Sequence, residues 1–120
     1  MIVWFKAGHI IYSEKDYANE IYFIKSGKIN FVLEEYENWP YINIKAGNYF
    51  GEVDVLLGQH RKLRAMVEKN TVLYVLKAEH FNEIFIHQFP NEGKKFFNKI
   101  VRKRTNQLKA RNDSINYCKN

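Results

Sequence analysis

Cysteine, proline and long apolar runs are scarce in this sequence, which has one cysteine and two prolines among 120 residues. The lone Cys118 cannot form a disulfide within the chain, and unpaired thiols are usual in a reducing compartment. No run approaches the roughly 18 consecutive apolar residues that cross a membrane, and the apolar start at residues 1–5 is too short for a signal peptide. These absences predict a soluble intracellular chain.

Groups that carry catalysis or bind metal are also scarce. The four histidines, His9, His60, His80 and His87, do not have the spacing of metal ligands, and no Ser/His/Asp or Cys/His combination stands out. A small β-barrel metalloenzyme of the cupin type would need a cluster of such ligands. We therefore predict that the protein is not an enzyme and that it carries no metal and no cofactor.

Positive charge is concentrated at the C-terminal end, in a chain whose formal net charge is +6. Residues 92–120 hold nine Lys/Arg against two Asp/Glu, which gives +7, and the other residues hold ten against eleven, which gives −1. A basic tail can meet nucleic acid, an anionic membrane surface or an acidic partner, or it can be a solvated helix face. A DNA-binding regulator needs a helix-turn-helix after its long helix, for which the sequence has no room, so we expect no nucleic-acid partner.

Short β-type segments fill the first two thirds of the chain. Residues 28–33 alternate apolar and polar side chains, and residues 71–76 are rich in β-branched residues, as is typical of strands. The tripeptide Lys-Ser-Gly at residues 25–27 separates the segments 20–24 and 28–33, which predicts a hairpin turn with Gly27 at positive φ. Strands that recur roughly every 8–12 residues indicate a sandwich or barrel.

The period of the pattern changes at Ala78. A helix of about ten residues ends before Pro90, and a second helix follows, with a stripe at helical spacing that becomes polar toward its end. The stripe consists of Phe96, Phe97, Ile100, Val101, Arg104 and Leu108. We expect the helices to cover residues 78–111 and residues 112–120 to form a frayed tail.

These patterns predict a fold of the α+β class that is mainly β. It consists of an antiparallel, jelly-roll-like β-roll over residues 1–77, followed by two C-terminal helices. A chain of this length is large enough for one hydrophobic core, so we expect residues 1–120 to form a single domain.

The clearest binding chemistry lies in residues 50–67, FGEVDVLLGQHRKLRAMV. The stretch opens with an aromatic residue, a glycine and a carboxylate, and it closes with a basic loop before a β-type segment. Gly51 allows the backbone to approach a ligand closely, free N–H groups at a helix start favour an anion, and Glu52 can accept hydrogen bonds from sugar hydroxyls. The stretch therefore predicts a site for a sugar joined to an anion.

The order of segments resembles a cyclic nucleotide-binding domain. The resemblance rests on AGHIIYSEKDYANEIYFIKSG, then IKAGNYFGE, then two leucines, a basic loop and RAMV, and it spans roughly residues 4–110. The segment FNEIFIHQFP is similar to the ion-channel members, in particular pacemaker-type, cyclic nucleotide-gated and ether-à-go-go-like channels. The resemblance implies a β-roll that binds cAMP or cGMP, with the last helix closing over the base.

The resemblance also implies which residues contact the nucleotide. Glu52 takes the ribose 2′-hydroxyl, backbone N–H groups of Val53 and Asp54 meet the cyclic phosphate, and Ala65 is the small residue near it. Apolar side chains on two strands touch the purine, and Lys103, with Gln107 beside it, caps the base from the last helix. The implied nucleotide-binding set is Phe31, Ile42, Ile44, Phe50, Gly51, Glu52, Val53, Asp54, Arg64, Ala65, Lys103 and Leu108.

Two positions depart from the family pattern. Counting back from Val67 places Leu63 where the phosphate-binding arginine is expected, and the loop before Val67 is about two residues longer than usual. Loss of a charge-assisted arginine–phosphate contact costs about 1.5–3 kcal/mol, roughly ten- to a hundredfold in affinity. Arg64 and Arg61 are close in sequence, and we predict Arg64 as the phosphate partner. Asp54 is the second departure, because small neutral residues usually stand there and a carboxylate repels a phosphate.

Two functions stay open from the sequence. The first is a regulatory domain that binds cAMP or cGMP and gates an attached ion channel, of the potassium or cyclic nucleotide-regulated class, by moving its last helix. Such a domain would be the cytoplasmic part of a membrane protein, following the rest of the channel subunit, in a homotetramer. The second is a non-binding homologue that acts by protein–protein contact, with its cavity empty or filled by its own tail, for which residues 115–117 are suited.

Overall fold

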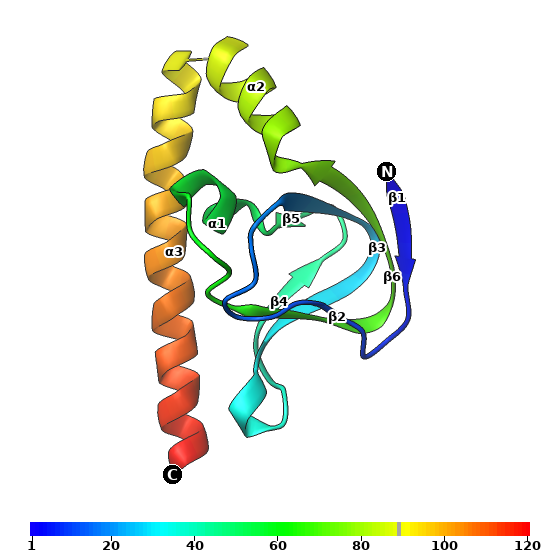
Figure 1. Cartoon of the computed structure of the whole chain (residues 1–120). Helices are drawn as coiled ribbons and strands as arrows, with labels where there is room; N and C mark the ends of the chain where they lie inside the picture. The colour runs from blue at the N-terminus through cyan, green and yellow to red at the C-terminus, as the bar shows by residue number, and fades with distance from the viewer. Residues whose placement is uncertain (89) are drawn as a thin grey trace.

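Six antiparallel strands form one sheet that curls into a roll, and helices cover its open side (Figure 1). The computed structural model describes residues 1–88 and 90–120. The strands are β1 (Ile2–Phe5), β2 (Ile10–Tyr12), β3 (Glu20–Leu33), β4 (Trp39–Lys45), β5 (Tyr49–Phe50) and β6 (Arg64–Lys77). They pair in the order β1-β6-β3-β4, with β2 added to β6 and β5 to β3. The predicted fold class, a mainly β roll followed by two C-terminal helices, is confirmed.

The prediction of a hairpin at residues 25–27 was wrong. Residues 20–33 form one continuous strand, β3, and the register against β6 shifts between Ile24 and Ile29. Gly27 has a φ of +101°, and a Cβ there would lie 2.1 Å from the Thr71 Oγ1. The glycine therefore marks a bulge where two long strands approach closely, and sequence alone does not separate this from a turn.

The three α-helices are α1 (Glu52–Leu57), which follows β5, α2 (Ala78–Gln88), which follows β6, and α3 (Pro90–Lys119), which follows α2. Pro90 starts α3, where its missing N–H is no cost. The predicted frayed tail was wrong, because α3 continues to Lys119. An exposed ion pair between Lys109 and Asp113 (Nζ to Oδ2, 3.0 Å), one turn apart, supports this last part of the helix. That residues 1–120 are a single domain stays a prediction.

Helix α3 runs along one side of the roll and presents a narrow face to it (Figure 1). Ile100, Arg104 and Gln107 are buried, at the spacing of one helix face. The predicted stripe was partly wrong, because its members Phe97, Val101 and Leu108 are exposed. The face that meets the roll is thus more polar than the apolar pattern implied, and charged residues form part of the contact.

The hydrophobic core lies inside the roll. It is built from buried residues of β2, β3, β5, β6 and the loop before β6: Tyr12, Tyr22, Ile24, Ile29, Phe31, Phe50, Leu63, Ala65, Val67 and Leu73. Among the described residues, no group of three or more His, Cys, Asp and Glu is arranged to hold a metal ion. A search of the same residues found no helix with the length and apolar character needed to cross a membrane.

Candidate functional site

The turn into α1 is built around Gly51. This residue is the N-cap of α1 and has a φ of 83°, and a Cβ there would lie 3.0 Å from the Tyr22 ring and 3.1 Å from the Arg61 Nη1. Only glycine fits this left-handed, crowded position. The turn directs Phe50 into the core, and it buries Glu52, Val53 and Asp54 in the first turn of α1. Two carboxylates are thereby removed from solvent, so each needs a cationic partner.

Arg61 holds the turn into α1 in place through hydrogen bonds. Its Nη1 donates to the Gly51 carbonyl (2.6 Å) and to the Asp54 Oδ2 (3.2 Å), and its Nη2 donates to the Glu20 carbonyl (2.6 Å). The Cζ lies 4.0 Å from the centroid of the Tyr12 ring, a cation–π distance. Arg61 is only 2% exposed. The guanidinium therefore fixes the loop before β6, the start of α1 and the start of β3 against one another.

Two ion pairs join α3 to the start of α1. Arg104 donates from Nη2 to the Asp54 Oδ1, and Lys103 donates from Nζ to the Glu52 Oε2. Arg104 and Asp54 are 8% and 3% exposed, so this pair is shielded from water. Both oxygens of Asp54 are thus taken, one by Arg61 and one by Arg104. We call the cluster of Glu52, Asp54, Arg61, Lys103 and Arg104 the ion-pair cluster.

A hollow of about 300 Å³ lies beside this cluster. Its lining comes from β3, β4, β5 with the turn before it, and α3: Phe31, Ile42, Asn43, Ile44, Asn48, Tyr49, Lys103 and Gln107. The structure thus brings together four predicted nucleotide-binding residues, Phe31, Ile42, Ile44 and Lys103, with Gln107 next to them. Leu108 does not line the hollow and is 37% exposed. The chain folds so that apolar strand residues and polar helix residues face one cavity.

Several buried polar atoms near the cluster have no hydrogen-bond partner among the described residues. They are the Glu52 Oε1, the Arg61 Nε, the Arg104 Nε and Nη1, the Gln107 Oε1 and the Tyr41 hydroxyl. Burial, the largest cause, raises the pKa of Tyr41 above the usual tyrosine value, which strengthens its preference for the neutral hydroxyl. Buried groups of this kind normally bind water or a ligand, and here they offer both donors and acceptors.

Three features together identify the fold. They are the glycine turn followed by a carboxylate, the curled antiparallel roll, and the helix that closes the roll. Residues 2–88 match the family described as "Cyclic nucleotide-binding domain". The chain belongs to this family. The match covers the whole roll and α2.

Known relatives agree with this assignment. The bovine (Bos taurus) protein "Cyclic nucleotide-gated channel beta-1" is 26% identical over 116 residues, which cover 88% of this chain and 8% of the channel. A solved EAL enzyme in its cGMP-bound form has a TM-score of 0.71 at 20% identity, over 88% of this chain and 28% of that one. The "regulatory subunit of a cAMP-independent protein kinase A from Trypanosoma brucei" has a TM-score of 0.65 at 18% identity, over 89% and 35%. At such identities, the solved structures establish the fold alone.

In this cyclic nucleotide-binding domain, Arg61 and Arg104 bind the Asp54 carboxylate at the start of α1, whereas Arg64, the predicted phosphate partner, contacts other groups. Arg64 donates instead to the Asn38 Oδ1 (2.9 Å), the Glu34 Oε1 (3.2 Å) and the Ser13 Oγ (3.3 Å). Side chains alternate along a strand, and Leu63 and Ala65 point into the core on either side of it. The sequence signal for Arg61 was its place in the basic loop beside Arg64, and the loop sequence alone does not show which of the two arginines reaches α1.

Arg104 was also missed as a site residue, although it was noticed in the stripe of the last helix. The available signal was its charge, because an arginine inside an apolar helical stripe needs a buried anion. Asp54 was recognised as unusual, but its two partners lie seven and 50 residues away in the sequence. The sequence around Asp54 does not indicate either arginine as its partner.

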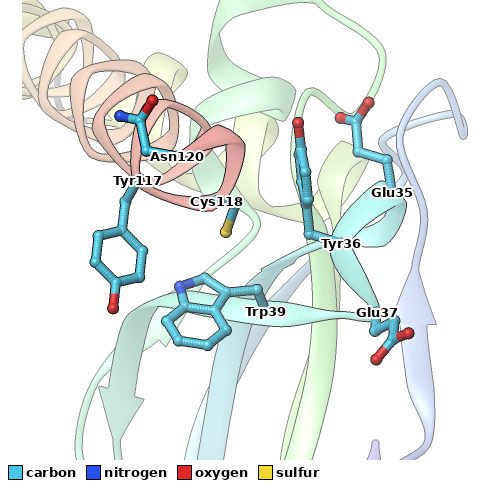
Figure 2. Close-up of a pocket in the computed structure, with 7 residues that line it drawn as sticks. All are labelled: Glu35, Tyr36, Glu37, Trp39, Tyr117, Cys118 and Asn120. Carbon is cyan, nitrogen blue, oxygen red and sulfur yellow. The ribbon is translucent and has the colours of Figure 1, made fainter.

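The C-terminal tail lies outside the roll. Tyr117 packs beside Trp39, with ring centroids 5.7 Å apart, at a separate hollow of about 660 Å³ near the end of α3 (Figure 2). That hollow is lined by Glu35, Tyr36, Glu37, Trp39, Tyr117, Cys118 and Asn120. The hypothesis that residues 115–117 fill the cavity of the roll was therefore wrong.

Proposed function

We propose that this cyclic nucleotide-binding domain is a regulatory module, in which a ligand bound in the roll changes the position of α3. One observation carries the proposal: Lys103 and Gln107 of α3 line the hollow, while Lys103 and Arg104 bind the carboxylates of α1. A ligand in the hollow would meet the same helix that the ion-pair cluster holds. The maximum effect on α3 equals the difference in ligand affinity between its two positions.

A cyclic nucleotide is the first ligand class to consider. In this proposal its ribose hydroxyl binds Glu52 in place of Lys103, and its base lies against Phe31, Ile42 and Ile44 under Lys103 and Gln107. Gly51 and Val53 supply backbone contacts, Phe50 and Ala65 pack behind them, and Asp54 competes with the phosphate for its two arginines. We expect weak binding, because the phosphate finds both guanidiniums already paired.

The parent protein in this proposal is a channel subunit. The similarity to a cyclic nucleotide-gated channel supports it, although the chain spans only 8% of that relative. We propose that the domain lies on the cytoplasmic side, follows the membrane part of a potassium or cyclic nucleotide-regulated channel, and assembles as part of a homotetramer. Its role would be regulatory and not catalytic.

Two measurements test the proposed function. Calorimetric titration with cAMP and cGMP to millimolar concentration reports binding. Spin labels at the exposed positions Asn112→Cys and Lys45→Cys, in a Cys118→Ser background, report the distance between α3 and the roll. We expect heat of binding and a shifted distance distribution. Binding without a shift would contradict the role of α3.

A second function is favoured by the ion-pair cluster itself. Because Asp54 holds Arg61 and Arg104 without any ligand, α3 can stay closed over the roll permanently, and the domain would then act by protein–protein contact. In that case, neither nucleotides nor nucleosides at millimolar concentration produce heat, and the spin-label distance stays constant.

A further inference from the structure

We propose that the ligand this site binds most tightly is an uncharged nucleoside, a ribose joined to a flat base, and not its cyclic phosphate. This inference rests on the proposed function and specifies its ligand. It depends on three observations: the Asp54 carboxylate in the ion-pair cluster, the direction of the β6 side chains away from it, and a lining of the hollow that is neutral apart from Lys103.

The first observation is that an internal carboxylate stands where the family places a phosphate. Asp54 lies in the first turn of α1, and each of its oxygens accepts from a buried guanidinium. A cyclic phosphate would need either to expel Asp54 from Arg61 and Arg104 or to lie beside it as a second anion. Both routes disfavour the phosphate in a buried site, because a displaced carboxylate would lose its partners without reaching water.

The second observation is that no further cation faces this place from β6. Leu63 is buried in the core, Ala65 beyond it carries no charge, and Arg64 between them is paired with Glu34. Arg61 makes two additional hydrogen bonds to the carbonyls of Gly51 and Glu20, which keep its guanidinium in its present position. The two guanidiniums that reach the start of α1, those of Arg61 and Arg104, are therefore both already paired with Asp54.

The third observation is that the lining of the hollow is neutral apart from Lys103, which is paired with Glu52. The hollow combines the apolar and aromatic side chains of Phe31, Ile42 and Tyr49 with the Gln107 amide, whose Oε1 is buried without a partner. Flat heteroaromatic bases pair with amides and pack on such walls. The unpartnered Glu52 Oε1 can accept from a sugar hydroxyl. A volume of about 300 Å³ lies at the lower end of small-molecule sites, which suits a ligand without a phosphate.

Calorimetric titration of the full chain with matched pairs of ligands tests the inference. The pairs are adenosine with 3′,5′-cyclic AMP and guanosine with 3′,5′-cyclic GMP. We expect at least one nucleoside to bind at least tenfold more tightly than its own cyclic phosphate. Equal affinities, or tighter binding of the cyclic nucleotide, would overturn the inference and leave the proposed function intact. No binding of either class would overturn the ligand-controlled function as well.

The variant Asp54→Asn tests whether the negative charge of this side chain, and not its size, disfavours the phosphate. In this variant we expect the cyclic nucleotide to gain at least tenfold in affinity, while the nucleoside changes less than threefold. Asp113→Asn makes the same chemical change on an exposed part of α3 and should leave every affinity unchanged. An unchanged preference in Asp54→Asn would overturn the role of this carboxylate.

A comparison on the unmodified chain keeps the inference testable if Asp54→Asn does not fold. 2′-Deoxyadenosine lacks the hydroxyl offered to Glu52, so we expect it to bind at least tenfold more weakly than adenosine. Equal binding of the two nucleosides would contradict the placement of the ribose at Glu52.

Discussion

Asp54, in the first turn of α1, and Arg104, near the middle of α3, form a buried ion pair between segments 50 residues apart in the sequence. Asp54 also binds Arg61, so one carboxylate connects the loop before β6, α1 and the last helix. The pair therefore joins the start of α1 directly to α3. Four substitution experiments test this ion-pair cluster and the packing of the strands of the roll.

Removal of Arg104 should detach α3 from the roll. We expect Arg104→Met to lower the free energy of unfolding by about 3 kcal/mol, the low end for breaking a buried ion pair, because Asp54 keeps Arg61. Urea unfolding followed by circular dichroism measures this. Arg102→Met, on the exposed side of the same helix, is the matched control and should change stability by less than about 0.5 kcal/mol. Equal effects of the two substitutions would contradict the cluster.

Arg61 should be more important for stability than Arg104. Its replacement leaves the Gly51 and Glu20 carbonyls without their present donor and removes one partner of Asp54. We expect Arg61→Met to cost about 4–5 kcal/mol in the free energy of unfolding. Lys62→Met changes the exposed neighbouring residue and should be nearly neutral. A cost for Arg61→Met below that of Arg104→Met would refute this ranking.

Two glycines at positive φ should respond differently to alanine. At Gly27 a Cβ would overlap Thr71, whereas at Gly47 (φ +91°) a Cβ would meet nothing within 4 Å. Both variants carry the strain of a left-handed alanine, about 1–2 kcal/mol. Gly27→Ala adds the cost of forcing apart β3 and β6, which brings its total to at least about 3 kcal/mol. Thermal denaturation of both variants decides this, and similar melting temperatures would argue against the bulge.

Alkaline pH should destabilise the roll through Tyr22. Burial, and secondarily the Glu20 carboxylate, raises the pKa of Tyr22 from 10.0 to about 12. The folded state keeps the phenol proton more tightly than the unfolded state. The stabilisation that Tyr22 contributes is therefore complete below pH 10 and is lost as the pH rises through 12. A difference of one pKa unit corresponds to about 1.4 kcal/mol, so the free energy of unfolding falls by about 2–3 kcal/mol.

The measurement for Tyr22 is the free energy of unfolding as a function of pH between 8 and 12. Tyr22→Phe should show a shallower decline above pH 10 than the unmodified protein, because a phenylalanine has no proton to lose. Tyr17→Phe, at a tyrosine that is 76% exposed, should follow the unmodified protein. An unchanged decline in Tyr22→Phe would show that this tyrosine does not titrate as the structure implies.

Much of the fold could be predicted because its signals are local. Alternation in residues 28–33 and the β-branched run at 71–76 identify strands, and the change of period at Ala78 coincides with the start of α2. Gly27 was recognised as special, but a turn and a bulge both need a glycine at positive φ. Only the pairing of β3 with β6 separates the two.

The length of the last helix, α3, could not be predicted from the sequence. Residues 112–120 were expected to form a frayed tail, yet α3 continues to Lys119. Its stabilising contacts come from outside the helix pattern, namely Tyr117 on Trp39 and Arg111 with Glu14. Such contacts depend on where the roll places a partner, which a helical period does not encode.

The sequence by itself determined the family and the glycine turn into α1. Phe50, Gly51 and Glu52 are adjacent in the chain, and a glycine turn before a buried carboxylate is a local property. Tertiary structure alone decided which cations pair with Asp54. Strand alternation directs Arg64 out and Leu63 in, and the fold brings Arg61 and Arg104 to Asp54 from two distant segments. Ion pairs join groups through space, so their partners are fixed by the packing of elements and not by the order of residues.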